Sequence, residues 1–269
     1  VLGHAFYGYY STIFESILVW GDCKRGGIQL SIDGISIKVG SLDEFNNVCE
    51  VLVEKVYSYF INNTKKDIVF DVGMNIGDAV LFFLSDPKVE KIYAYEPFKD
   101  TFASARENLK EYLDDTDRLE IFQFGISDKN EVRKIGFNEG MTCGQSTVES
   151  IRQTVYEEYY ANGLVKPENE QTDQIEVKDA VDVFNPIFEK YSNDNNMVLK
   201  MDCEGEEYGI IRELYENALL EKFDYIMLEW HYKGKEEILK YLNKSGFSYL
   251  CVDISNDMGS IYAYHMQSR

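Results

Sequence analysis

The chain has 269 residues, with 27 Lys and Arg against 47 Asp and Glu, which gives a formal net charge of −20. This balance argues against a protein that binds the nucleic-acid backbone or an anionic membrane surface, because both need a basic face. The five cysteines lie far apart without a C-x-x-C pair, so we expect no zinc ribbon and no disulfide framework. These cysteines favour a reducing, cytoplasmic compartment. The sequence contains no run of about 18 apolar residues, so we expect no membrane span.

Residues 1–66 are predicted to form an extension made of a helix, a hairpin and a second helix. Residues 5–20 are apolar and aromatic and are interpreted as the first helix. Two alternating segments, 28–32 and 35–39, flank Asp33-Gly34, which is typical of a β-hairpin with a two-residue turn. Apolar residues then recur at three- and four-residue spacing from Phe45 to Phe60, which predicts an amphipathic helix.

From residue 67 to residue 269 the pattern predicts one α/β domain. Short apolar runs alternate with amphipathic helical segments, as expected for βαβ units around a buried parallel sheet. The end of the chain differs, because a short connection between two strands allows only an antiparallel hairpin. The predicted strands are 68–72, 92–95, 119–124, 197–201, 225–228, 249–254 and 260–265, and the predicted helices are 79–84, 102–113, 210–218 and 235–245.

Residues 138–174 interrupt this alternation. The segment is polar and contains glycine, with a predicted helix over Glu149–Tyr160. It is too long for an ordinary loop, so we interpret it as a functional insertion or a lid that moves over the site. Its tyrosines, Tyr156, Tyr159 and Tyr160, are placed either to stack on a sugar or apolar ring of a substrate or to pack against the core.

Two motifs follow neighbouring strands and indicate a nucleotide-like ligand. The segment Asp71–Asp78 carries Gly73 and Gly77 between a strand and a helix, where a backbone approaches a ligand closely. Its Asp-x-Gly-x-x-x-Gly spacing differs from the Gly-x-Gly-x-x-Gly of nicotinamide-binding turns. Glu96 lies at the end of the next strand. In doubly wound sheets, an acid at about this distance along the chain from the glycine turn accepts hydrogen bonds from ribose hydroxyls.

Two further strand ends carry acids and a histidine. In Lys200–Glu207, strand alternation sends Lys200, Asp202 and Glu204 to one side. Glu206 and Glu207 are interpreted as helix-start residues. Glu229 and His231 share a side at the end of the next strand. Because ligands bind outside the carboxyl ends of parallel strands, these side chains are candidates for catalysis.

Taken in order, these motifs resemble those of FkbM-type methyltransferases, class I enzymes that depend on S-adenosylmethionine. The resemblance covers about residues 67–265 and implies a Rossmann-like sheet of seven strands. Their implied order is 3-2-1-4-5-7-6, with the last strand antiparallel and helices on both faces. The motifs that carry the resemblance are Asp71–Asp78, Tyr95-Glu96-Pro97, Gly125–Asp128, Lys200–Glu207 and Glu229-Trp-His231.

The resemblance implies S-adenosyl-L-methionine as cofactor and S-adenosyl-L-homocysteine as product. The glycine turn would pack against the cofactor, with Asp71 and Asn75 at its amino-acid end, Glu96 at its ribose and the loop that holds Ser127 near its adenine. The residues expected to bind the cofactor are Asp71, Gly73, Asn75, Gly77, Glu96, Ser127 and Asp202.

A hydroxyl is a poor nucleophile until its proton is removed, so the reaction needs a base. His231 is the first candidate because an imidazole titrates near neutrality, and Glu204 or Asp202 is the second. A divalent metal on Asp202, Glu204, Glu229 and His231 is an alternative, since such ligands suit Mg²⁺ or Mn²⁺, but we favour a site without metal.

The predicted function is therefore O-methylation of a hydroxyl on a sugar, glycolipid or secondary metabolite, so the expected partner is a small molecule or glycan. A non-catalytic binding protein on a methyltransferase fold and a nicotinamide-dependent oxidoreductase are the alternatives. An RNA methyltransferase is disfavoured by the charge and by Asp202-Cys-Glu204-Gly205, which stands where an Asn-Pro-Pro-Tyr-like motif would be.

Overall fold

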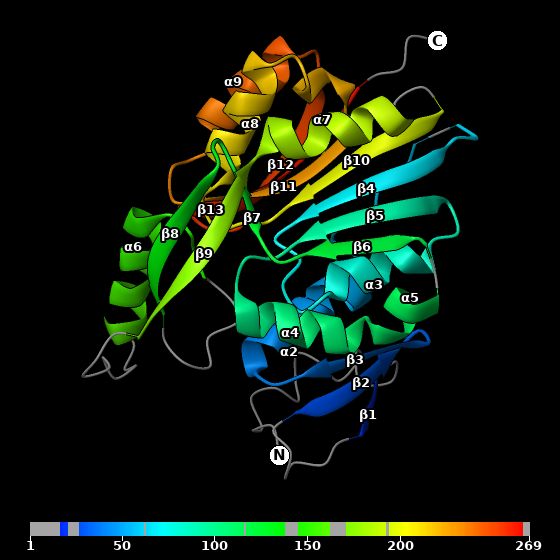
Figure 1. Cartoon of the computed structure of the whole chain (residues 1–269), viewed down its shortest axis with the longest axis vertical. Helices are drawn as coiled ribbons and strands as arrows, with labels where there is room; N and C mark the ends of the chain where they lie inside the picture. Colours follow the sequence, from blue (N-terminus) through cyan, green and yellow to red (C-terminus); the bar gives the residue numbers. More distant parts are fainter. Residues whose placement is uncertain are drawn as a thin grey trace.

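A computed structural model describes residues 17–20, 27–61, 63–115, 117–137, 145–161, 171–191 and 194–265 of the chain. Its centre is a seven-stranded sheet with the strand order β12-β13-β11-β10-β4-β5-β6 (Figure 1). The strands are β4 (Lys66–Val72), β5 (Val89–Tyr95), β6 (Leu119–Phe122), β10 (Asn195–Met201), β11 (Tyr225–His231), β12 (Ser248–Asp253) and β13 (Met258–Tyr264).

The strand directions match the predicted topology. Strands β6, β5, β4, β10 and β11 are parallel neighbours, and β13 pairs antiparallel with both β11 and β12. Counted along the chain, this is the order 3-2-1-4-5-7-6 with the last strand antiparallel, which confirms the prediction. Helical crossovers join β4 to β5, β5 to β6 and β10 to β11, whereas the connection between β12 and β13 is short and permits only a hairpin.

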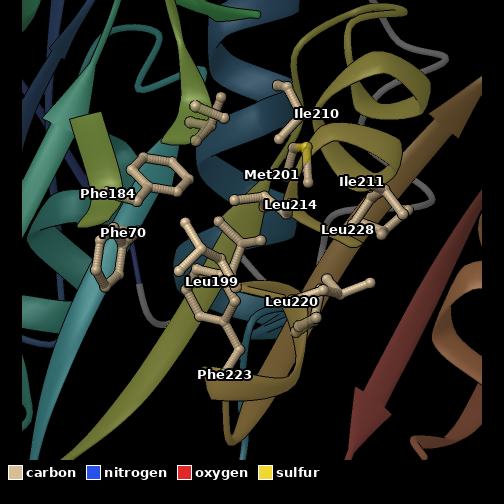
Figure 2. Packing of buried hydrophobic residues seen from close by; sticks show 14 of the residues in the cluster. Phe70, Phe184, Leu199, Met201, Ile210, Ile211, Leu214, Leu220, Phe223 and Leu228 are labelled. Atoms are coloured by element: carbon tan, nitrogen blue, oxygen red, sulfur yellow. The ribbon is translucent and has the colours of Figure 1, made fainter. Parts of the chain in front are cut away.

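Helices cover both faces of this sheet (Figure 1). Along β4, Phe70 packs in the core under α7, α8 and α9, while Val69 packs in the core under α3 and α4. The Phe70 ring centroid lies 4.9 Å from that of Phe184 and 5.3 Å from that of Phe223 (Figure 2). The helices are α3 (Asp78–Ser85), α4 (Lys99–Asn108), α5 (Lys110–Asp115), α7 (Ala180–Tyr191), α8 (Glu207–Glu216), α9 (Glu236–Lys244) and the 3-10 helix η3 (Leu220–Lys222).

The N-terminal hairpin is confirmed, but the helix predicted over 5–20 is wrong at its end. Strands β2 (Ile28–Ile32) and β3 (Ile35–Val39) form the hairpin, and β1 (Ile17–Trp20) pairs antiparallel with β2. Residues 5–16 lie outside the described part of the chain. Ile17, Val19 and Trp20 are residue types that occur often in strands, and their pairing with the edge of the hairpin stabilises a strand here instead of a helix.

The second predicted helix is shorter than the pattern from Phe45 to Phe60 suggests. Ser41 caps α2 (Leu42–Val48), which continues as the π-helix η2 (Cys49–Glu54). Lys55 then adopts φ +57°, which ends the helix. Buried residues of β2, β3, α2 and η2 share one core with α3 and α4, and these two helices lie between the hairpin and the main sheet (Figure 1).

A second sheet that sequence patterns did not predict stands beside the main one (Figure 1). It has the order β7-β9-β8, with β7 (Gly125–Ser127), β8 (Glu131–Phe137) and β9 (Gln171–Asp179). The predicted helix of the insertion is confirmed as α6 (Glu149–Ala161), although the side chains of Tyr156, Tyr159 and Tyr160 lie outside the described part. None of the helices in the described ranges has the length and apolar composition needed to cross a membrane.

Candidate active site

A cavity of about 540 Å³ opens at the carboxyl ends of β4, β5, β10 and β11. Most of the residues singled out from the sequence line its wall. These are Gly73, Asn75, Glu96, Asp202, Glu204, Glu229 and His231. Asp71, Gly77 and Ser127 lie near the wall without lining it.

The glycine turn after β4 depends on the absence of a side chain at Gly73. Its φ is +80°, and a Cβ there would lie 1.8 Å from the carbonyl oxygen of Asp202. The Asp202 amide in turn donates to the carbonyl of Val72 over 3.0 Å. The ends of β4 and β10 are therefore in direct backbone contact, which places Asp202 at the cavity. Gly77, with φ +91°, precedes α3 and faces Leu109 instead.

Behind the turn, Asp71 and Lys200 form a buried ion pair with a 3.0 Å separation. Lys200 Nζ also donates to the carbonyl oxygen of Gly73 over 2.6 Å. Burial raises the pKa of Asp71, and Lys200 partly opposes this shift. Burial alone would lower the pKa of Lys200, but Asp71 and Asp202 outweigh it and raise the pKa. Asp71 is fully buried, and its ion-pair partner is Lys200. Because Lys200 also binds the carbonyl of Gly73, the pair stabilises the glycine turn.

Glu96, at the end of β5, is joined to the turn through Asn75. The Asn75 amide donates to Glu96 Oε2 over 3.1 Å, and the Phe98 amide donates to Oε1 over 3.0 Å. Asn75 adopts φ +50°, a left-handed conformation that costs energy for a residue other than glycine and is often found at functional sites. Burial raises the pKa of Glu96 to about 7.

His231, at the end of β11, is held by a carboxylate that the sequence reading assigned to a helix start. Glu207 Oε1 lies 3.2 Å from His231 Nδ1 and accepts the His231 backbone amide over 2.8 Å. Glu207 Oε2 accepts the amide of Gly205 over 2.7 Å. Glu207 is fully buried and its carboxylate is committed to these donors, so it orients the imidazole ring.

The other ring nitrogen of His231 faces three carboxylates. Nε2 lies 3.7 Å from Glu204 Oε2, 3.9 Å from Asp202 Oδ1 and 3.9 Å from Glu229 Oε1. Burial would lower the pKa of His231, but Glu204, Glu207 and Asp202 outweigh it and raise the pKa well above the ordinary value. The pKa of Glu229 is also raised, first by burial and then by repulsion from Asp202. The predicted convergence of these four side chains is therefore present.

Ser127 lies in a buried polar network rather than at the cavity. Its hydroxyl donates to Glu206 Oε2 over 2.6 Å and accepts from Arg133 Nη2 over 2.9 Å. Glu206 also accepts the hydroxyl of Thr147 over 2.6 Å and pairs with Arg133. This network joins β7, β8 and the insertion to the start of α8. Ile126, the residue before Ser127, lines the cavity, and so do Thr147 and Glu206 of this network.

Sequence reasoning missed the residues that the N-terminal extension contributes to the cavity. Glu50 and Glu54 of η2 line it, together with Tyr57. The Tyr57 ring centroid lies 5.3 Å from Lys200 Nζ, and its hydroxyl reaches Asp202 Oδ2 at 3.5 Å. The amphipathic pattern of this segment predicts burial but does not tell which part of the sheet it covers, so no local signal identifies these residues.

The strand order and the cavity define the class of fold: a Rossmann-like sheet of the class I methyltransferase type, with its pocket at the carboxyl ends of the central strands. The model of the "Methyltransferase FkbM domain" family matches residues 71–249, which is more than half of the chain. The chain belongs to this family, and the resemblance predicted from the motifs is confirmed.

Solved structures of other methyltransferases are similar to this chain at low identity. The FkbM methyltransferase of Methylobacillus flagellatus KT has 15% identity and a TM-score of 0.45, with 80% of this chain and 47% of that chain covered. This chain therefore spans about half the length of that protein. TYW2 of M. jannaschii, solved with S-adenosylmethionine, has 12% identity, a TM-score of 0.44, and 93% and 92% coverage. The comparison with curated proteins finds no match.

Proposed function

We propose that the chain transfers the methyl group of S-adenosylmethionine to a hydroxyl oxygen of a sugar, glycolipid or secondary metabolite. One observation carries this proposal beyond family membership: a buried histidine is oriented by Glu207 and meets Glu204 and Asp202 at the cavity wall. Such a cluster suits an acceptor that must lose a proton as it reacts, as a hydroxyl does.

The cavity has the size and the polar groups that the cofactor needs. Its volume falls within the range of about 300–1,000 Å³ that is usual for small-molecule sites. Glu96 lines it with a carboxylate whose remaining lone pairs suit ribose hydroxyls, and Asn75, Gly73 and Asp202 line the adjoining wall. When bound, the cofactor supplies a methyl group on a sulfonium, which becomes a neutral thioether as the acceptor oxygen bonds to carbon.

Glu204 is the group that we propose to take the acceptor's proton. The His231 ring is buried, and Glu207 contacts its Nδ1 atom. Little of the ring is therefore accessible to a substrate. The Glu204 side chain is 23% exposed against 4% for His231, so a bound substrate reaches it more readily. Glu204 lies just after β10 and adopts φ +55°, a left-handed conformation of the kind often found at functional sites. His231 and Asp202 complete the catalytic group.

The decisive experiment separates binding from chemistry. Calorimetry with S-adenosylhomocysteine is expected to show one site per chain, and labelled S-adenosylmethionine with a pool of metabolites is expected to yield a labelled acceptor. Glu204→Gln and His231→Ala are each expected to lower turnover about 10²–10⁴-fold while S-adenosylhomocysteine binding persists. Unchanged turnover in both variants would show that the catalytic assignment is wrong.

The same measurements distinguish the alternatives. If S-adenosylhomocysteine produces neither heat nor a shift in melting temperature, the methyltransferase proposal fails, and a positive NADH titration then indicates an oxidoreductase. If the cofactor binds but no acceptor in the pool is labelled, a non-catalytic binding protein becomes the better interpretation.

A further inference from the structure

Three potential metal ligands meet at the cavity wall. Asp202, Glu229 and His231 each offer one ligand atom, and these atoms all lie within 4.8 Å of one another. Asp202 follows β10, while Glu229 and His231 lie two residues apart on the neighbouring parallel strand β11. The pairing of the two strands brings the three side chains together, since strand ends in a parallel sheet meet at one edge.

The orientation of His231 is an independent sign of a ligand. Its side chain is only 4% exposed, and Glu207 takes up the Nδ1 side of the ring. The Nε2 side then points toward the acids, where the nearest carboxylate oxygens are 3.7–3.9 Å away, beyond hydrogen-bond distance. Histidines that bind metals usually donate their other ring N–H to a carboxylate, and Glu207 stands where it can accept such a hydrogen bond from Nδ1.

The separations suit an ion at the centre of the three atoms. Bonds of about 2.1 Å place neighbouring ligand atoms about 3.0 Å apart and opposite ones about 4.2 Å apart. His231 Nε2 lies 3.9 Å from Asp202 Oδ1 and from Glu229 Oε1, between these limits. The Asp202 and Glu229 side chains are 31% and 21% exposed, so small rotations are open to them.

Apart from His231, the acids of the cluster, Asp202 and Glu229, have no cationic side chain as an ion-pair partner among the described residues. Lys200 is committed to Asp71 and to the carbonyl of Gly73. Carboxylates suit Mg²⁺ and Mn²⁺, and the added imidazole favours Mn²⁺ over Mg²⁺.

We propose that Asp202, Glu229 and His231 bind one divalent cation of the Mn²⁺ type, with Glu207 as a positioning residue. This proposal departs from the sequence-based preference for a site without metal. The inference deepens the proposed function and rests on it only for the role of the ion in turnover. In that role the ion binds the acceptor oxygen and makes its proton more acidic, and Glu204, which lies outside the triad, receives that proton.

The test measures binding without turnover. The metal-stripped full chain is titrated with Mn²⁺, and the free ion is followed by electron paramagnetic resonance, with and without S-adenosylhomocysteine. One ion per chain is expected. Asp202→Asn and Glu229→Gln are each expected to weaken binding at least tenfold, and Glu207→Gln about 10–100-fold although it removes no ligand.

Glu54→Gln is the matched control, because Glu54 is an acid of the same cavity outside the triad. It is expected to change Mn²⁺ affinity less than threefold. Equal losses in Glu54→Gln and Asp202→Asn would overturn the proposal, as would a stoichiometry far below one in a chain whose melting temperature is normal. Methyl transfer without Mn²⁺ binding would refute the metal site alone, whereas Mn²⁺ binding without S-adenosylhomocysteine binding would refute the proposed function alone.

Discussion

Gly73→Ala tests the contact between β4 and β10 that shapes the cavity. The added Cβ would lie 1.8 Å from the carbonyl oxygen of Asp202, at a φ of +80°. Gly34→Ala is the matched control, because its φ is +85° but nothing lies within 4 Å of the added atom. Both variants place alanine in a left-handed conformation, and only Gly73→Ala also creates an overlap.

The structure gives the size of each effect. Alanine at a left-handed position costs about 1–2 kcal/mol, which is the whole expected loss for Gly34→Ala. A normal contact of about 3.5 Å requires the overlapping atoms of Gly73→Ala to separate by about 1.7 Å. Overpacking of this kind costs about 1–3 kcal/mol more, so Gly73→Ala is expected to lose about 2–5 kcal/mol of unfolding free energy.

Urea unfolding followed by circular dichroism measures the two losses, and calorimetry with S-adenosylhomocysteine measures the consequence for the site. Because displacement of the β10 end moves Asp202 and the turn together, Gly73→Ala is expected to weaken binding at least tenfold, while Gly34→Ala leaves it unchanged. The reasoning is refuted if the two variants have the same free energy of unfolding within experimental error and bind S-adenosylhomocysteine equally.

Three further substitutions probe the supports of the cavity. Lys200→Met leaves the buried Asp71 without its cation and is expected to cost about 3–5 kcal/mol in urea unfolding; adding Asp71→Asn should recover part of this, and no recovery would contradict the ion pair's role. The pKa of Glu96 is raised from 4.5 to about 7 on folding, so the folded state holds the proton longer and stability is lost as pH rises from about 4.5 through 7. The free energy of unfolding of Glu96→Gln, measured across this pH range, should fall less steeply with pH than that of the parent, and the fall that remains is due to Asp78. The same pH dependence in both proteins would refute the raised pKa of Glu96. Ser127→Ala should cost about 1–3 kcal/mol by breaking buried hydrogen bonds, with S-adenosylhomocysteine affinity within twofold of the parent, and a large affinity loss would instead support the predicted cofactor contact.

Local patterns were sufficient for the central sheet and for the strand ends that carry the site. Residues such as Phe70 and Val69 lie in buried strands between amphipathic helices, and this alternation leaves few possible topologies. Acids and glycines at strand ends then gather at one edge, so Asp202, Glu229 and His231 were expected close together, as they are.

The remaining parts depend on long-range pairing, which local patterns do not encode. The strand β1 adopts its conformation because it pairs with β2, and the sheet of β7, β8 and β9 joins segments that the whole insertion separates in the chain. Such contacts form only when the whole chain folds, so neither was predicted.

The sequence by itself determined the succession of strands and helices and the set of polar residues at the strand ends, because strand periodicity and short motifs are local properties. The resemblance of those motifs to a known family implied the sheet order. Only the tertiary structure decided how those residues are used. In the folded chain Glu207 contacts His231, and Tyr57 of the N-terminal extension contacts Asp202. Asp71 and Ser127 are buried in contacts with other protein side chains. Each of these depends on distances between segments that are remote in the chain, which packing sets and residue order alone does not.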